Sequence, residues 1–350
     1  MASSSSSSPF LMLPVADENT EKIQHLSFYN FKNNKPYNLK LPPTLKNTQF
    51  QCIGSSKGWL AFLDQTLKNP FLFNPFSQTL IHLPQNHPDI TKLILSQDPS
   101  LRPHTYSAIA IQTPLLSTKL SYSRNRDATW HALPNQSNTY YDAICCDATN
   151  TLFALAPGLQ VESWNLNDDS PTKSTIIRPS YPRSLRLAKE AFPRDLYSSQ
   201  LYLALASGGD IIVAVRYVGE FVRYDGEAVY EGDTLTDYMA APLVCPYRTM
   251  GFRVLRADVS GGEWADVEGL GDYAMFLGGN ETAVVPAVGL MKNAIYFTDD
   301  YWERIDEDYS YGGHDFGVFC MEDSRFEEVL DLEMDKINPP PFWITLPSSP

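Results

Sequence analysis

The sequence predicts an all-β fold, a single β-propeller built from four-stranded blades. Two observations lead to this prediction. Short apolar segments of strand length alternate with polar or proline-containing breaks. A Leu-Pro ending recurs at intervals of about 40 to 50 residues, which is the length of one blade. Because a small sheet cannot bury both of its faces alone, such units become stable when they stack around an axis.

The strand pattern is clearest in residues 58–84, which read GWLAFLDQTLKNPFLFNPFSQTLIHLP. Three segments of strand length lie within this stretch, at residues 59–63, 71–73 and 79–83, and residues 52–54 precede them as a fourth. Glycine and proline occupy the breaks, where a turn uses a positive or fixed φ and no strand partner needs the N–H. The pattern predicts an antiparallel meander of four strands.

The repeated ending marks the blade boundaries. Pro42, Pro84 and Pro134 each follow a leucine at the close of a unit, 42 and 50 residues apart, and Pro179 continues the series 45 residues later. Later units carry a related pattern of a large apolar residue, a two-residue gap and another apolar residue, at Trp264-Ala-Asp-Val267 and Phe326-Glu-Glu-Val329.

The number of blades depends on the 89 residues between Pro179 and Glu268. They hold either two blades or one blade with an insertion. Strand-like segments on both sides of the polar, glycine-containing residues 219–247 favour the insertion. The sequence therefore favours six blades, with seven as the alternative, in one propeller domain over residues 9–346 after a disordered serine-rich tail at residues 1–8.

Composition places the chain among soluble globular proteins. With 350 residues and 43% hydrophobic content it can bury a large core, and its apolar runs fall far short of the roughly 18 residues of a membrane helix. No secretory or transit signal is visible at the N-terminus, so we expect a location in the cytoplasm or nucleus. The five scattered cysteines are typical of reduced thiols.

The net charge of −14 is concentrated at one end of the chain. Residues 257–350 contain 4 Lys and Arg against 20 Asp and Glu, whereas residues 1–256 are nearly balanced, with 23 against 21. Such an acidic region repels nucleic acid and anionic lipid. We therefore expect a protein partner, which could carry a basic surface, no nucleic-acid or membrane partner, and a monomeric chain.

Six ordered motifs carry a family resemblance: Gly54-Ser-Ser-Lys-Gly-Trp59, Phe73-Asn-Pro75, Gly251-Phe-Arg-Val254, Trp264-Ala-Asp-Val-Glu-Gly-Leu270, Ala274-Met-Phe-Leu-Gly278 and Ile295-Tyr-Phe-Thr-Asp-Asp300. Together they resemble the plant F-box-associated, kelch-like propeller domain of unknown function, of the KIB type. The resemblance runs from about Pro9 to the C-terminus. It implies a plant protein and a propeller, and it brings no catalytic residues.

The same resemblance implies a role as the substrate-receiving half of a ubiquitin ligase, because many relatives carry a helical F-box before the propeller. Here residues 1–50 show no helical periodicity, and residues 10–15 and 23–31 are predicted strands. The leading hypothesis is therefore a non-enzymatic, protein-binding propeller without an F-box. The alternative is a propeller enzyme acting on a glycan or another small molecule in the axial pocket.

The segment 299–314 is the strongest candidate for a binding surface. It combines eight ionisable groups with four aromatic residues in a predicted loop, and aromatic residues on such loops often carry binding energy. The competing interpretation is a solvated acidic loop whose tyrosines cover strand ends. The candidate residues are Asp300, Tyr301, Trp302, Tyr309, Tyr311 and His314, with the insertion 219–247 as a second part of the recognition face.

The sequence shows no motif typical of catalysis or of cofactor binding. The acidic loop lacks the EF-hand spacing, the six histidines form no metal-binding pattern, and neither GxSxG nor a phosphate-binding loop occurs. We expect no catalytic residue, metal or cofactor. Residues 123–130 predict a hairpin turn, Cys145 and Cys146 lie in a predicted strand with one thiol in the core, and the basic residues between 178 and 194 predict a solvated linker between blades.

Overall fold

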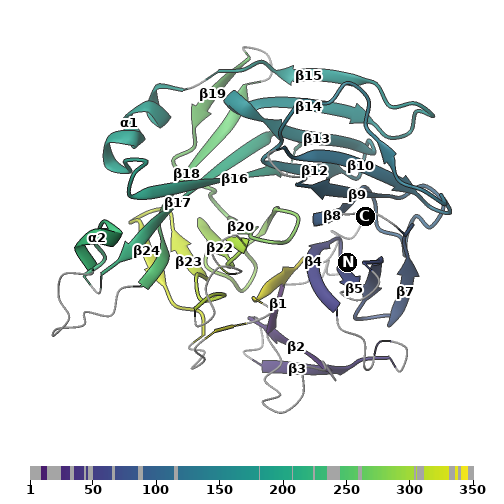
Figure 1. Cartoon of the computed structure of the whole chain (residues 1–350), viewed down its shortest axis with the longest axis horizontal. Helices are drawn as coiled ribbons and strands as arrows, with labels where there is room; N and C mark the ends of the chain where they lie inside the picture. Colours follow the sequence, from purple (N-terminus) through teal and green to yellow (C-terminus); the bar gives the residue numbers. More distant parts are fainter. Residues whose placement is uncertain are drawn as a thin grey trace, which may run out of the picture.

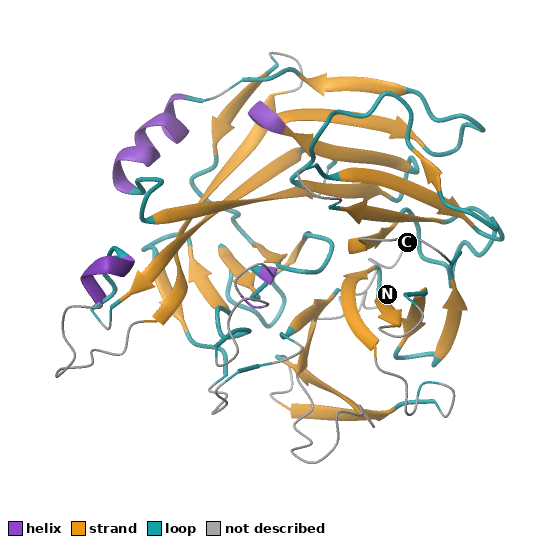
Figure 2. Cartoon of the chain, viewed as in Figure 1, coloured by secondary structure: helices purple, strands orange, loops and turns teal. Residues whose placement is uncertain are grey.

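The structure of the chain is a computed structural model. It describes residues 9–345 apart from 14–24, 32–34, 43–44, 46–49, 65–67, 86–89, 114–116, 181, 207, 224, 235–244, 259–261, 303–304, 306–310, 331–335 and 338–339. The structure consists mostly of strands, which make up 53% of it, whereas helices make up 4%. Figure 2 shows how the two are distributed. The predicted all-β propeller is confirmed.

The described strands form six sheets, named A to F here. Sheet A contains β25 (Phe342–Ile344), β1 (Phe10–Leu13), β2 (His25–Asn30) and β3 (Lys35–Lys40). Sheet B contains β4 (Phe50–Ser56), β5 (Trp59–Asp64), β6 (Pro70–Asn74) and β7 (Thr79–His82). Sheet C contains β8 (Ile90–Leu95), β9 (Ser107–Gln112), β10 (Lys119–Arg124) and β11 (His131–Ala132).

The second half of the chain forms the other three sheets. Sheet D contains β12 (Asp142–Cys146), β13 (Thr151–Ala156), β14 (Gln160–Asn165) and β15 (Lys173–Ile177). Sheet E contains β16 (Tyr197–Leu205), β17 (Ile211–Val222), β18 (Cys245–Asp258) and β19 (Glu263–Asp266). Sheet F contains β21 (Ala283–Pro286), β20 (Tyr273–Leu277), β22 (Ala294–Phe297), β23 (Gly317–Cys320) and β24 (Arg325–Glu327).

The sheets stack face to face in a closed ring (Figure 1). Six buried apolar clusters fill the spaces between successive sheets, in the order A–B, B–C, C–D, D–E, E–F and F–A. Each sheet alternates its side chains between the two neighbouring clusters: in β12, Ile144 packs against sheet E and Cys145 against sheet C. This is the mutual covering of small sheets that the repeat predicts.

The two ends of the chain close the ring in sheet A. Strand β25 pairs with β1, with Phe342 opposite Met12 and Ile344 opposite Phe10, and β25 also lies against β4 of the next sheet. The innermost strands β4, β8, β12, β16 and β21 follow one another around the axis in the same way. The ring is therefore closed by the pairing of β25 with β1, and the side chains of Phe342 and Ile344 pack between sheets A and B.

Shortening a buried side chain in the closing strand is expected to weaken the entire domain. Ile344 is fully buried between sheets A and B, so Ile344→Val is expected to lower the free energy of unfolding by about 1 kcal/mol, measured by urea denaturation. Val288→Ala is the control, because 52% of Val288 is exposed, and it is expected to change stability by less than about 0.5 kcal/mol. If both variants lowered the free energy of unfolding by the same amount, β25 would not be tightly packed between sheets A and B.

Sheet F departs from a simple meander, since β20 pairs with β22 in parallel and with β21 in antiparallel orientation. After β20 the chain crosses the axis in residues 278–282 and returns as β21 on the inner edge of the sheet. Gly278 has φ +139°, and a Cβ atom on Gly279 would collide with the ring of Phe342. Glycine at both positions is what allows the chain to cross there.

The structure contains several local features that the sequence predicts. The meander β4 to β7 is confirmed, and so is the prediction that one thiol of the Cys145-Cys146 pair enters the core, since Cys145 is the buried one. The turn before β11 is confirmed as well, and in it Asp127 accepts the N–H of Arg124 at 2.8 Å. The predicted insertion 219–247 overlaps β17 and β18, and the connection between them contains helix α2 (Glu231–Thr234). Residues 235–244 lie outside the described part.

The basic linker between sheets D and E contains a helix that the sequence analysis did not predict, α1 (Arg183–Ala191). Leu185 and Ala188, three positions apart, pack into the apolar cluster between these sheets, and Phe192 stacks on Tyr217 just beyond the helix. A short 3-10 helix, η1 (Pro157–Leu159), lies earlier in the chain. None of the helices in the described residues is long and apolar enough to cross a membrane.

Candidate functional site

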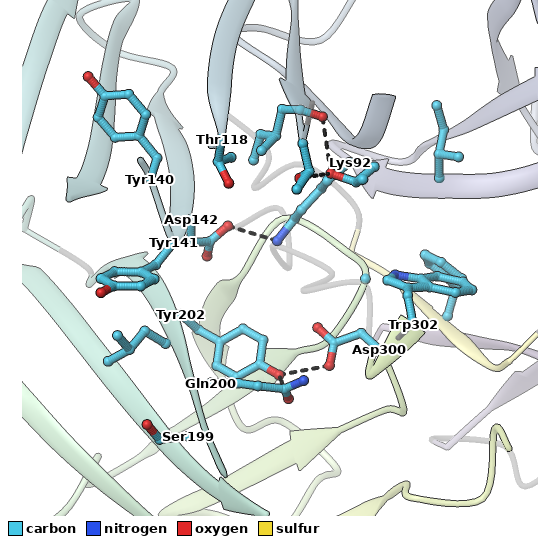
Figure 3. A pocket seen from close by; sticks show the side chains of 17 residues that line it. Lys92, Thr118, Tyr140, Tyr141, Asp142, Ser199, Gln200, Tyr202, Asp300 and Trp302 are labelled. Atoms are coloured by element: carbon cyan, nitrogen blue, oxygen red, sulfur yellow. Dashed lines mark hydrogen bonds and ion pairs between the residues drawn. The ribbon is translucent and has the colours of Figure 1, made fainter. Parts of the chain in front are cut away.

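A pocket of about 290 Å³ lies at one mouth of the ring, where several innermost strands begin. We call it the axial pocket. Its walls come from five of the six sheets and from the connection after β22, so it is a property of the closed ring and of no single blade (Figure 3). The polar and aromatic residues that matter below are Lys92, Tyr141, Asp142, Tyr202, Asp300 and Trp302.

Two carboxylates of the axial pocket are tied into the fold. Asp142, which is 2% exposed, accepts Lys92 Nζ at 2.9 Å through Oδ1 and the N–H of Leu203 at 2.9 Å through Oδ2. Asp300 accepts the hydroxyl of Tyr202 at 2.8 Å through Oδ1, and Arg216 approaches the same oxygen at 3.1 Å. These bonds link sheets C, D and E with the connection that follows β22.

The crossing segment 278–282 lies beneath the axial pocket, which Gly279 lines. Glu281, which is 6% exposed, accepts the N–H of Cys145 at 3.0 Å through Oε1 and Lys57 Nζ at 3.3 Å through Oε2. The Ser56 hydroxyl donates to that second oxygen as well. Burial alone would lower the pKa of Lys57, but the charges of Glu281 and Asp147 raise it, so the ammonium stays charged.

A buried charge cluster joins sheets E and F beside the pocket. The guanidinium of Arg216 in β17 is 1% exposed, bonds Asp315 Oδ2 at 2.8 Å as well as Asp300, and lies 5.0 Å from the ring of Phe297. Asp315 also accepts the N–H and hydroxyl of Thr249. The single guanidinium holds two carboxylates in place because its planar fork of donors reaches both of them.

Asp299 lies in the same cluster and is 1% exposed. Its carboxylate accepts the Tyr247 hydroxyl at 2.7 Å and the N–H of Gly313 at 2.8 Å. Burial, followed by the negative charge of Asp315, raises the pKa of Asp299 to about 7, while the Tyr247 bond and Arg216 act in the opposite direction. Burial also raises the pKa of Asp300, against the opposing effects of Arg216 and Tyr202.

The raised pKa of Asp299 makes stability depend on pH. An unfolded Asp loses its proton near pH 4, whereas folded Asp299 keeps it to about pH 7. Between these values the unfolded chain binds fewer protons, so this group lowers the free energy of unfolding as pH rises, and the loss levels off above pH 7. Relative to wild type, Asp299→Asn is therefore expected to gain about 2 kcal/mol between pH 5 and pH 8, measured by urea denaturation. A pH-independent difference would contradict this.

A second pocket of about 370 Å³ lies on the flank of the ring, between the start of β18 and strands β23 and β24. Its lining includes Cys245, Tyr311 and His314. The Cys245 thiol lies 2.8 Å from the Tyr311 hydroxyl, and the Tyr311 ring stacks on His314 with centroids 5.0 Å apart. Burial raises the pKa of Cys245, so this thiol is held in its unreactive, protonated form.

The six residues predicted as one binding surface are divided by the structure. Asp300 and Trp302 line the axial pocket, and Tyr311 and His314 line the flank pocket. Tyr301 lies between them, packed on Tyr247 and donating its hydroxyl to Glu220 at 3.0 Å. Tyr309 lies outside the described residues.

Sequence reasoning did not identify Lys92, Tyr141, Asp142 or Tyr202 as site residues. Lys92, Tyr141 and Asp142 lie at or near the beginning of the innermost strands β8 and β12, whereas Tyr202 lies in the second half of β16. The first three therefore share one signal in the sequence, their place just after a blade boundary. Within the described residues, no cluster of three His, Cys, Asp or Glu side chains is placed to hold a metal ion.

Several solved structures match the chain at low similarity. TolB from Acinetobacter baumannii matches with 10% identity and a TM-score of 0.45, over 97% of this chain and 67% of that chain. Hydrazine synthase from Kuenenia stuttgartiensis matches with 10% identity and a TM-score of 0.37, over 75% and 68%. A chain of a nidogen/laminin complex matches with 7% identity and a TM-score of 0.27, over 60% and 89%.

Comparison with whole protein sequences and with family models gives different results. No curated protein matches the chain. The family model described as the KIB1-4 beta-propeller matches residues 28–320, which include β3 and the end of β2 in sheet A, all of sheets B to E and sheet F up to β23. This agrees with the KIB-type resemblance of the six sequence motifs. The chain therefore belongs to the KIB1-4 β-propeller family.

Proposed function

We propose that this propeller binds another protein and that the partner contacts the face that carries the axial pocket. The observation that carries the proposal is the pair of aromatic side chains that line the pocket, Tyr141 and Trp302. Tyr141 is 49% exposed, although most large apolar residues of the ring are buried. Exposed aromatic residues beside a pocket are typical anchors of protein interfaces.

The chemistry of the pocket supports binding over catalysis. A glycosidase needs one carboxyl group free to give a proton and another free to attack or activate water. Here Asp142 accepts bonds from Lys92 and the main chain through both oxygens, and Asp300 accepts Arg216 and Tyr202 through one of its two oxygens. The two residues therefore offer one unbonded oxygen and not two free carboxyl groups. The bonds that these two carboxylates accept connect neighbouring sheets and so stabilise the fold. A receptor for a polypeptide is also the role that the family resemblance implies.

The experiment is affinity capture with the purified chain as bait, comparing three proteins. A partner is expected to bind wild type and to bind Tyr141→Ala at least tenfold more weakly, because an anchoring aromatic contributes about 2 kcal/mol. The matched control is Leu101→Ala. Leu101 is 62% exposed and follows the end of β8, whereas the pocket residue Lys92 lies near its beginning. A partner that Leu101→Ala loses and Tyr141→Ala keeps would overturn the proposal.

A further inference from the structure

One oxygen of the Asp300 carboxylate faces the axial pocket and has no bond in the described structure. Oδ1 receives both the Tyr202 hydroxyl and Arg216, while no described residue donates to Oδ2. Figure 3 shows the second oxygen turned toward the open space, with Lys92 across it and Trp302 beside it. The side chain is 13% exposed, so a donor that reaches Oδ2 must come from within the pocket.

The charges around this oxygen favour a cation over an anion. Arg216 and Lys92 are the two cationic groups that bond the pocket carboxylates. Three carboxylates pair with them, Asp142 and Asp300 in the pocket wall and Asp315 behind it. The ammonium of Lys92 is already bonded to Asp142 at 2.9 Å. A bound anion would face this excess of negative charge, whereas a bound cation would reduce it.

The walls of the pocket suit the rest of such a ligand. Tyr141 and Trp302 lie on opposite sides of the open space in Figure 3, and Trp302 packs at 6.1 Å on the buried Phe342 ring. Aromatic faces attract a neighbouring cation, and they also cover the methylene stem of a lysine or arginine side chain. The volume of about 290 Å³ is enough for one long side chain with its flanking main chain.

We infer that the axial pocket receives a positively charged side chain, lysine or arginine, from the protein partner, and that this side chain bonds Oδ2 of Asp300 between Tyr141 and Trp302. The inference rests on the proposed function, since it names the part of the partner that enters the pocket. Asp300, which lies on the connection after β22, is then the residue that selects a cationic side chain. The other walls of the pocket come from the sheets of the ring.

The test uses three small probes on the purified full chain: N-acetyl-arginine methylamide, N-acetyl-lysine methylamide and the neutral isostere N-acetyl-citrulline methylamide. Binding is followed by ligand-observed NMR. At least one cationic probe is expected to bind in the millimolar range, at least tenfold more tightly than the citrulline probe, because an added charge-assisted bond and a cation–π contact exceed about 1.4 kcal/mol together.

Asp300→Asn is the sharpest variant. Its amide oxygen still accepts Tyr202 and Arg216, but its NH₂ group replaces Oδ2 and repels the cation. It is expected to weaken the binding of the cationic probe at least tenfold, and Asp169→Asn, which changes an exposed acid in the connection between β14 and β15, is expected to leave binding unchanged. If Asp300→Asn does not fold, Trp302→Leu replaces it, because leucine keeps an apolar contact with Phe342 and removes the cation–π face.

The outcomes separate the two proposals. Equal binding of the arginine, lysine and citrulline probes, or binding of none, would overturn the cation pocket even if capture of a partner still depends on Tyr141. Asp300-dependent binding of a cationic probe supports the inference. The same result without any captured partner would leave the cation site standing and count against the protein-binding role.

Discussion

Replacing Arg216 with methionine is expected to lower the free energy of unfolding by about 3–5 kcal/mol, because it leaves buried carboxylates without their counter-charge. Methionine keeps the apolar contact with Phe297, but it removes the bonds to Asp300 and Asp315 at 3.1 and 2.8 Å. Those two residues connect the strand β17 to the segment that follows β22. Chemical denaturation of the two proteins measures the loss.

The matched control is Arg253→Met in the neighbouring strand β18. Arg253 pairs with Asp266 at 2.9 Å, a distance close to that in the buried cluster, but both side chains are more than one-third exposed. Exposed pairs contribute about 0–1 kcal/mol, so we expect little change in this variant. If both arginine variants lost the same free energy, burial would not be what gives the Arg216 cluster its importance.

Replacing Glu281 with alanine is the second change with a large expected effect, again about 3–5 kcal/mol. Glu281 lies at the centre of the ring and bonds groups from two sheets, Lys57 after β4 and the N–H of Cys145 in β12. Its removal leaves a buried ammonium and a buried main-chain donor without their partner. The melting temperature and the urea midpoint are expected to fall together.

A conservative variant distinguishes charge from shape at this position. Glu281→Gln keeps an oxygen for the Cys145 N–H and loses the charge beside Lys57, so its cost is expected to be smaller than that of alanine. The control is Glu263→Ala at the exposed start of β19, which is expected to change stability by less than about 0.5 kcal/mol. A Glu281→Ala variant as stable as wild type would show that the crossing segment does not hold the ring together.

Much of the fold follows from the sequence because each blade is a local unit. The meander β4 to β7 is contained in residues 50–82, with short turns, so its pattern of apolar segments is complete within one stretch. The parallel pairing of β20 and β22 is different. It results from residues 278–282 crossing the axis, and that path is favoured by contacts with β4 and β12, which lie far away in the sequence.

The candidate site was predictable only in part, for a related reason. The acid- and aromatic-rich segment after β22 pointed to Asp300 and Trp302 through its composition alone. The other walls of the axial pocket lie on separate sheets and meet only when the ring closes, as Lys92 and Asp142 do across 50 residues of sequence. The helix α1 was missed because its described side chains mark a buried face at two positions, Leu185 and Ala188.

The central claim is that the partner contacts the face carrying the axial pocket, and amide hydrogen exchange tests it most directly. Exchange would be compared in the free chain and in its complex with the partner recovered by capture. We expect protection to concentrate at residues 91–92, 140–142, 199–202 and 300–302, which line the axial pocket. Protection confined to the flank pocket or to the outer strands, with unchanged exchange in these four segments, would contradict the claim.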